Sequence, residues 1–138
     1  MPDRCTYDYA IVRVVPRVER GEFLNVGVVL FGREQGFLAA RFEIDPLRLR
    51  SLAPDLDLAT VERHLGTFRA ICEGQPDGGP IAALPPSERF HWLVAPRSTM
   101  IQTSPVHVGR SEEPAQALDD LLNEFVRPVV HAAGTEGT

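Results

Sequence analysis

Four residues in three consecutive apolar segments could together form a site for an anion. Arg13 interrupts YAIVRVV and Arg41 interrupts FLAARF, while Asn25 and Gly27 break the apolar run FLNVGVVLF between them. Guanidinium groups match the oxygen atoms of carboxylates and phosphates, and glycine leaves space for a ligand beside them. One hairpin would pair Arg13 near Asn25, and the next would pair Gly27 near Arg41. In that register the sequence predicts a shallow hollow flanked by two guanidinium groups.

The pairing of the strands decides whether this arginine-lined hollow forms. Side chains alternate across a strand, so Asn25 and Gly27 are expected on one face together with three apolar residues: Phe23, Val29 and Phe31. A change of register by one residue would move Arg13 to the opposite face. In the structural alternative, Asn25 bonds to the backbone at a bulge that Gly27 marks, and the two arginines form internal ion pairs. The acids considered for those pairs are Asp8, Glu22 and Glu43.

A second candidate anion site lies in the segment APRSTMIQ. It offers a guanidinium group, two hydroxyls and an amide, carried by Arg97, Ser98, Thr99 and Gln102. Such groups hold phosphate oxygens beside the end of a strand. A plain turn is the alternative, in which the same side chains only satisfy backbone groups. Arg97, Ser98 and Gln102 complete the expected ligand-binding set.

The absence of lysine excludes several reactions, since all 14 basic residues are arginines. The chain forms no Schiff base, completes no Walker-type phosphate loop and lacks the ATP-pairing lysine of protein kinases. No G-x-S-x-G, C-x-x-C or H-E-x-x-H motif is present. We therefore expect no metal, no cofactor and no catalytic residue. The remaining enzymatic hypothesis uses His91 or His107 with a carboxylate as an acid–base pair.

The composition is typical of one globular domain. The chain has 138 residues, of which 43% are hydrophobic and 24% charged, and its net charge is −5. This acidity argues against a dedicated nucleic-acid-binding protein, which carries a basic stripe. No apolar run approaches the roughly 20 residues that span a membrane, and we expect no signal peptide, because the segment MPDRCTYDY has no apolar stretch. We expect a cytoplasmic protein with free thiols at Cys5 and Cys72.

Hydrophobic patterning predicts the elements that position these residues. Five strands are expected, the last of them interrupted at Pro105: residues 7–16, 22–31, 37–44, 89–96 and 98–109. The first three are joined by short loops, which favours an antiparallel meander. The segment 74–87 has three glycines and four prolines and is expected to be a loop.

Three segments show helical signals. Asp45 and Pro46 begin one or two turns, and the next segment has an apolar stripe at Leu58, Val61, Leu65, Phe68 and Cys72, with Gly74 at its end. Ser111 is expected to cap a final helix with its own stripe: Leu118, Leu121, Leu122, Phe125, Val126 and Val129. The predicted fold is α+β, with two amphipathic helices packed on one face of the sheet. Residues 1–131 are expected to form this single domain and 132–138 a disordered tail.

Four stretches resemble a bacterial family classed only as a domain of unknown function, number 3037. They are YAIVRVVP, RGEFLNVGVVLF, WLVAPRSTMIQTSP and LDDLLNEFV, and the similarity covers roughly residues 7–130. The resemblance implies no activity, cofactor or catalytic residue. It implies a small companion protein encoded beside kinases of the HipA type, and hence a kinase as protein partner.

Taken together, these features favour a non-catalytic accessory or protein-interaction module. Its binding surface would be an exposed sheet edge or the 74–87 loop. The alternative is a small domain that binds a phosphorylated ligand or a nucleic acid through the arginine-lined hollow.

Overall fold

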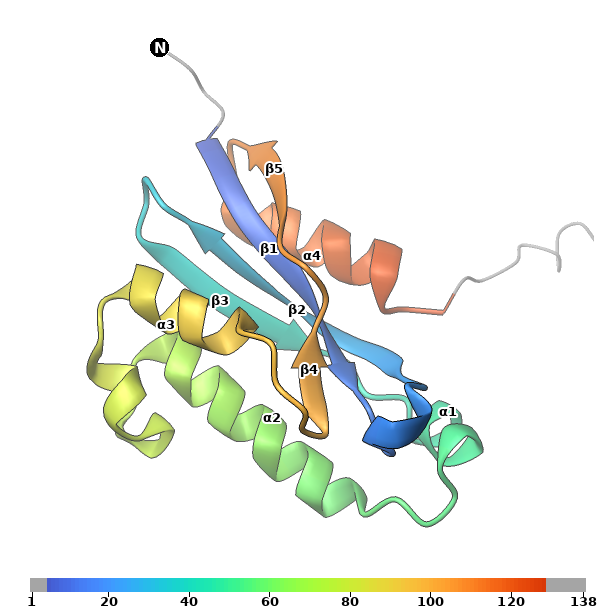
Figure 1. Ribbon diagram of the computed structural model, residues 1–138. Coiled ribbons are helices and arrows are strands. Elements are labelled where there is room, and N and C mark those ends of the chain that lie inside the picture. Colours follow the sequence, from blue (N-terminus) through green and yellow to red (C-terminus); the bar gives the residue numbers. More distant parts are fainter. Residues whose placement is uncertain (1–4, 129–138) are drawn as a thin grey trace, which may run out of the picture.

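Residues 5–128, the part of the chain that this computed structural model describes, form a five-stranded antiparallel sheet and four α-helices (Figure 1). The strands run β3-β2-β1-β4, and β5 also pairs with β1. The strands are β1 (Cys5–Val14), β2 (Leu24–Gly32), β3 (Phe37–Phe42), β4 (Ile101–Thr103) and β5 (His107–Ser111). The helices are α1 (Pro46–Leu52), α2 (Leu58–Glu73), α3 (Pro86–Val94) and α4 (Pro114–Phe125), with short 3-10 helices η1 (Val18–Arg20), η2 (Pro76–Gly78) and η3 (Pro80–Ala83). The predicted α+β class is confirmed.

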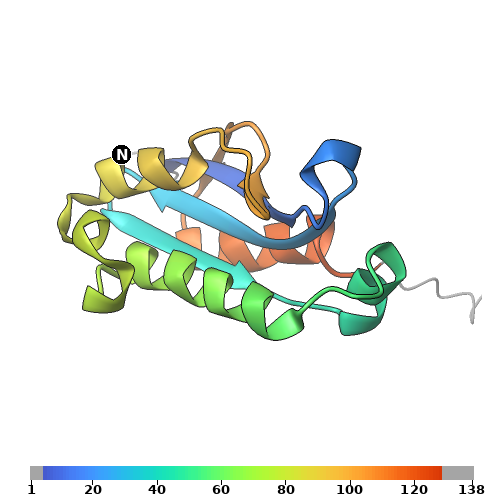
Figure 2. The ribbon, with the colours of Figure 1, turned by 60° about the horizontal axis from the view of Figure 1, so that its bottom comes forward.

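Helices cover both faces of the sheet, with α2 and α3 on one side and α4 on the other (Figures 1 and 2). Val12 and Val29 pack under α2 and α3, whereas Val28 and Leu30 pack under α4. The expectation that both amphipathic helices share one face is therefore wrong. The central strands are apolar on both faces, so each face needs a cover of its own. None of the helices in residues 5–128 has the length and apolarity to span a bilayer.

Aspartate side chains cap the starts of the first two helices, and a glycine ends the second. The Asp45 carboxylate accepts hydrogen bonds from the backbone at the start of α1, where Pro46 occupies the first turn, and Asp57 does the same for α2. Gly74 ends α2 in the left-handed conformation, at a φ of 69°. Cys72 lies on the buried face of α2 as expected, and burial raises the pKa of its thiol to about 12. The predicted helix with the apolar stripe is thus confirmed.

The start of the last helix differs from the prediction. Glu113 occupies the N-cap position of α4 without a side-chain capping hydrogen bond, and the Ser111 hydroxyl accepts a hydrogen bond from the Glu113 backbone N–H in the preceding turn. Pro114 occupies the first turn and fixes the start of the helix. The expected tail, residues 132–138, and the last stripe residue, Val129, lie outside the described residues.

The expected strand 89–96 is a helix, α3. Its buried residues Phe90 and Leu93 are three apart, and Pro86 lies in the first turn. Arg89 fixes α3 against the end of α2, because its guanidinium donates to the carbonyls of Ile71, Cys72 and Leu84 at 2.7–2.8 Å. The expected loop 74–87 contains η2 and η3, and its last two residues already belong to α3.

The last expected strand is divided at Pro105, as predicted. β4 and β5 both pair with β1, and Ser104 occupies the junction between them with 4% of its surface exposed. The Ile11 N–H donates to the Ser104 hydroxyl oxygen at 2.9 Å, and the Ser104 N–H donates back to the Ile11 carbonyl at 2.8 Å. Ser104 thereby satisfies the backbone of β1 at the point where β1 changes partner.

Replacing Ser104 by alanine should lower the free energy of unfolding by about 1–3 kcal/mol, since the buried Ile11 N–H would lose its acceptor. Urea denaturation monitored by circular dichroism measures the change. Ser98→Ala is the control, because Ser98 is exposed and such a substitution should stay within about 0.5 kcal/mol of the original chain. Equal stabilities for the two variants would show that Ser104 does not support the junction.

Candidate functional site

Three of the expected ligand-binding residues lie in one row across the sheet. Arg13 of β1 pairs with Asn25 of β2 on one side, as predicted, and with Gln102 of β4 on the other. Side chains directly opposite one another on neighbouring strands point to the same face. The Asn25 amide donates to the carbonyl of Phe125, at the end of α4, which identifies that face as the one covered by α4.

A bulge in β2 separates Asn25 from Gly27. Val12 pairs with Gly27 and the next residue, Arg13, pairs with Asn25, so Val26 has no partner in β1. One extra residue reverses the alternation, and Gly27 therefore lies on the α2 face with Val12. The expectation that Asn25 and Gly27 share a face is wrong, and the alternative that placed a bulge beside Gly27 is the arrangement found.

The second hairpin leaves no space above Gly27. It pairs Gly27 with Phe42 and Arg41 with Val28, one residue away from the predicted pairing of Gly27 with Arg41. A Cβ atom on Gly27 would lie 2.3 Å from Cδ1 of Phe42 and 2.5 Å from the Arg41 carbonyl oxygen. Glycine is required here because the Phe42 ring lies over the backbone. The expected hollow is filled by an aromatic ring of the core.

Gly27→Ala should destabilise the fold by about 1–3 kcal/mol, because Phe42 or the backbone of β3 must move to admit the new methyl group. The matched control is Gly66→Ala on α2, where nothing lies within 4 Å of the added Cβ. This control should raise stability by about 0.5–1 kcal/mol, the usual difference between glycine and alanine inside a helix. Thermal or urea unfolding of both variants tests the pair, and a Gly27→Ala variant of unchanged stability would contradict the packing argument.

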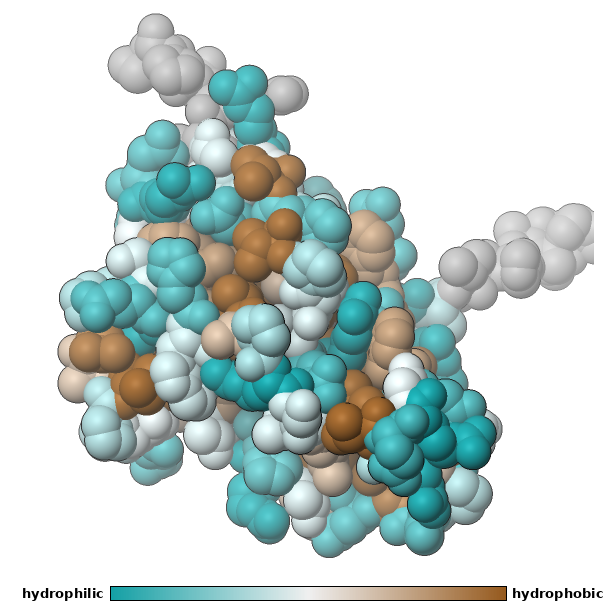
Figure 3. All heavy atoms as spheres, in the orientation of Figure 1, coloured by the Kyte–Doolittle hydropathy of each residue, from teal (hydrophilic) through white to brown (hydrophobic). Residues whose placement is uncertain are grey.

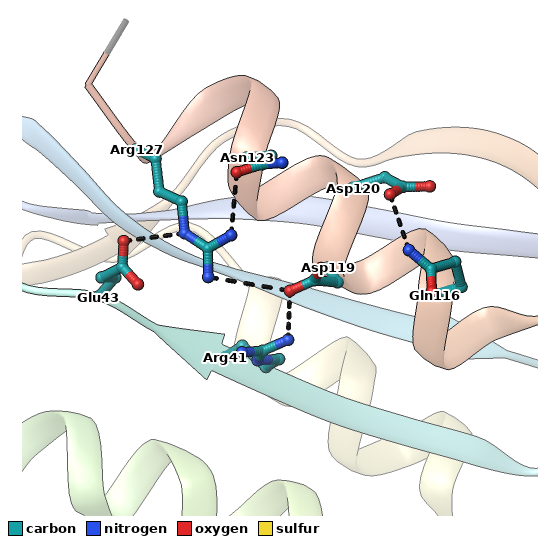
Figure 4. A network of polar contacts seen from close by, with 7 residues as sticks. All are labelled: Arg41, Glu43, Gln116, Asp119, Asp120, Asn123 and Arg127. Atoms are coloured by element: carbon teal, nitrogen blue, oxygen red, sulfur yellow. Dashed lines mark hydrogen bonds and ion pairs between the residues drawn. The ribbon is translucent and has the colours of Figure 1, made fainter. Parts of the chain in front are cut away.

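Arg41 lies on the α4 face but is paired with an acid of α4. Its Nη1 lies 2.5 Å from a carboxylate oxygen of Asp119 (Figure 4). Arg127 extends the network by donating to Glu43 and Asn123, each at 2.9 Å, and lies 3.8 Å from Asp119. The hydrogen bond to Glu43 raises the pKa of Arg127. These contacts join the end of β3 to α4, and they leave Arg41 already neutralised.

Arg13 is held by an aromatic ring instead of an acid. Its guanidinium carbon lies 4.1 Å from the centre of the Phe23 ring. Within residues 5–128 its Nε atom is buried without a hydrogen-bond partner, and so is the amide oxygen of Asn25. A buried donor and a buried acceptor therefore lie on neighbouring strands, on the α4 face.

A hollow of about 370 Å³ lies on the opposite side of the sheet, between α2, α3 and β4. This volume falls in the usual range of ligand pockets. Its lining is mostly apolar, and we call it the α2–α3 hollow: Phe68 and Ile71 of α2, Trp92 and Leu93 of α3, Met100 and Ile101 at β4, with His64, Thr67, Arg97 and Thr99 as its polar residues. The 74–87 segment contributes no side chain to it.

Trp92 and Arg97 form a stacked pair at this hollow. The indole is 41% exposed, and the Arg97 guanidinium carbon lies 4.2 Å from the ring centre while its Nη2 donates to the Trp92 carbonyl. Burial lowers the pKa of Arg97 because desolvation disfavours its charged form. Arg97 takes part in none of the ion pairs found within residues 5–128. A guanidinium group without a counterion thus lies beside an apolar hollow.

The rest of the APRSTMIQ segment divides between the two faces. Thr99 lines the α2–α3 hollow, Ser98 is exposed beside it, and Gln102 lies with Arg13 and donates to the Thr99 carbonyl at 2.9 Å. Sequence reasoning singled out Arg97 but missed Trp92. The available signal was an apolar run too short to distinguish a strand from a helix.

Residues 9–126 match a family described as Protein of unknown function (DUF3037). The chain belongs to this family. No curated protein and no solved structure matches the chain. The matched range of the DUF3037 domain includes both the Arg13 row and the α2–α3 hollow.

Neither histidine of the acid–base hypothesis forms an ion pair with a carboxylate within residues 5–128. His91 is exposed on α3, and His107 lies on β5 with its ring 5.5 Å from that of Tyr9. Within residues 5–128, no three histidine, cysteine, aspartate or glutamate side chains are grouped to hold a metal ion. The α2–α3 hollow is therefore the site with the most defined chemistry in the described chain.

Proposed function

We propose that this DUF3037 domain is a non-catalytic accessory module that binds a partner protein through the α2–α3 hollow. The observation that supports this proposal is the half-exposed Trp92, stacked with Arg97 at an apolar hollow. Tryptophan and arginine are enriched among the residues that dominate binding energy in protein interfaces. A surface of this kind gains affinity by desolvating an inserted side chain and needs no reacting group.

The lining of the α2–α3 hollow is better suited to binding a side chain of a partner protein than to catalysing a reaction. The apolar residues Phe68, Leu93 and Met100 offer contact area. The two hydroxyls of the lining, of Thr67 and Thr99, donate to backbone carbonyls and not to a base. The stacked guanidinium limits the motion of the Trp92 ring, which lowers the entropy lost when a partner binds. The partner that the family resemblance suggests is a kinase of the HipA type.

If the partner is a HipA-type kinase, binding of that kinase to the purified domain should depend on Trp92. Isothermal titration calorimetry should give a complex whose affinity falls about 30-fold in Trp92→Ala, the loss expected for a residue that dominates an interface. Leu47→Ala is the matched control, because Leu47 is an apolar residue 78% exposed on α1, outside the hollow. Circular dichroism verifies that both variants fold.

Two results would contradict parts of this proposal. A kinase that does not bind the domain would remove the HipA-type kinase as partner. Equal affinities for the original chain and Trp92→Ala would remove the α2–α3 hollow as docking site.

A phosphorylated ligand or a nucleic acid is the second candidate. The observation that favours it is the Arg13 Nε donor, which lies between Gln102 and Asn25 in one row and lacks a partner within residues 5–128. Arg41 is already paired with Asp119, so an anion at this row would bind to Arg13. Phe23 would then have to move away from the Arg13 guanidinium, because its ring lies against that group.

If the row binds phosphate, inorganic phosphate or a nucleotide should raise the melting temperature, and Arg13→Gln should abolish that shift. Differential scanning fluorimetry provides the measurement, and Arg110→Gln on β5 controls for the lost charge. A shift that persists in Arg13→Gln, or no shift at all, would leave the Arg13 row as a structural contact between the sheet and α4.

A further inference from the structure

Arg97 differs from Arg20 and Arg41 because, within residues 5–128, no acid pairs with its guanidinium. One hollow of about 260 Å³ has Arg20 in its lining, but Arg20 pairs with Glu22 at 2.8 Å. Another of about 260 Å³ has Arg48 in its lining together with the carboxylates of Glu43 and Asp45. Both of these hollows therefore have carboxylate as well as guanidinium groups in their lining. The α2–α3 hollow has a guanidinium and no carboxylate in its lining.

The guanidinium of Arg97 is held in place, and most of its N–H donors remain available for a ligand. Its Nη2 donates to the Trp92 carbonyl and its guanidinium carbon lies 4.2 Å from the centre of the indole ring, and these are the contacts found for it within residues 5–128. A guanidinium has five N–H donors in a fixed fork, which matches the two oxygens of a carboxylate. Because stacking already restricts the side chain, little further ordering is needed to form that pair.

From this geometry we infer that the segment received by the α2–α3 hollow presents a carboxylate next to a large apolar side chain. The apolar side chain enters against Phe68, Leu93 and Met100, and the carboxylate pairs with Arg97. The occupant is thus an acidic, apolar peptide segment of a partner protein. This inference rests on the proposed function and specifies the chemistry of the partner.

The partial burial of Arg97 strengthens the pairing. Burial already disfavours the charged guanidinium, as its lowered pKa indicates, so a carboxylate gains more there than at a fully hydrated arginine. Without the carboxylate, a partner that covered the hollow would bury an uncompensated charge. A purely apolar segment is therefore disfavoured even though the floor of the hollow is apolar.

Selection of a random peptide library on the full chain tests this inference. Peptides that need the hollow are recognised by loss of binding to Trp92→Ala, and they should share aspartate or glutamate beside a large apolar residue. For a synthetic peptide of that sequence, Arg97→Gln should reduce the affinity about tenfold or more, as expected for a charge-assisted hydrogen bond. Replacing the acid of the peptide by its amide should have the same effect.

A double-mutant cycle and a charge control separate the pair from other effects. The two changes together should cost no more affinity than either alone, because each removes the same contact. Arg50→Gln, which removes one exposed charge on α1, should leave the affinity unchanged. The peptide in which the acid is replaced by its amide tests the same contact on the unaltered protein. This measurement remains valid even if the Arg97→Gln variant unfolds.

The failures of the two proposals are distinguishable. Peptides that depend on Trp92 but lack an acid and bind Arg97→Gln normally would overturn the inference and leave the docking hollow standing. Small apolar carboxylic acids should be screened for binding in parallel by calorimetry. If such an acid binds the hollow and no peptide does, the inference is also overturned. A selection that yields no peptide dependent on Trp92 would count against the proposed function itself.

Discussion

The β1–β2 pair is apolar on both of its faces, and this constraint determines where every long helix lies. Val12 and Val29 face one side, Val28 and Leu30 face the other, and none of them is exposed. A sheet with two apolar faces cannot be covered by one layer, so α4 packs on one face and α2 with α3 on the other. The α2–α3 hollow follows from this division, because it lies where two helices and the short strand β4 meet over a single face.

The sequence indicates part of this arrangement. The strand at 22–31 is apolar at both alternating sets of positions, which indicates burial on both sides. The strand order of the first three strands and the 58–73 helix could be predicted from spacing and caps alone. The segment RFHWLV could not, because an apolar run of that length fits a buried strand as well as a short helix. Reading it as a strand concealed Trp92, which the helix presents beside the α2–α3 hollow.

The bulge at Val26 shows why strand periodicity failed at the candidate site. Alternation places Asn25 and Gly27 together, and one unpaired residue between them reverses it. Gly27 marks the position locally, but the reason for the glycine is the ring of Phe42 from the next hairpin. Local sequence therefore indicated that something unusual occurs at 25–27. Its geometry depended on a packing partner that strand patterns do not specify.

The arginines illustrate the same dependence on distant contacts. In sequence, Arg41 and Arg97 are equivalent: each is a single guanidinium beside an apolar run. The fold neutralises Arg41 with Asp119, 78 residues further along the chain, and gives Arg97 an indole and a carbonyl but no acid within residues 5–128. An ion pair fastens α4 to the sheet, whereas an uncompensated and partly desolvated charge raises the energy of the free protein until a counterion arrives. What distinguishes the surroundings of these two arginines is the acid that tertiary packing supplies to Arg41 and withholds from Arg97.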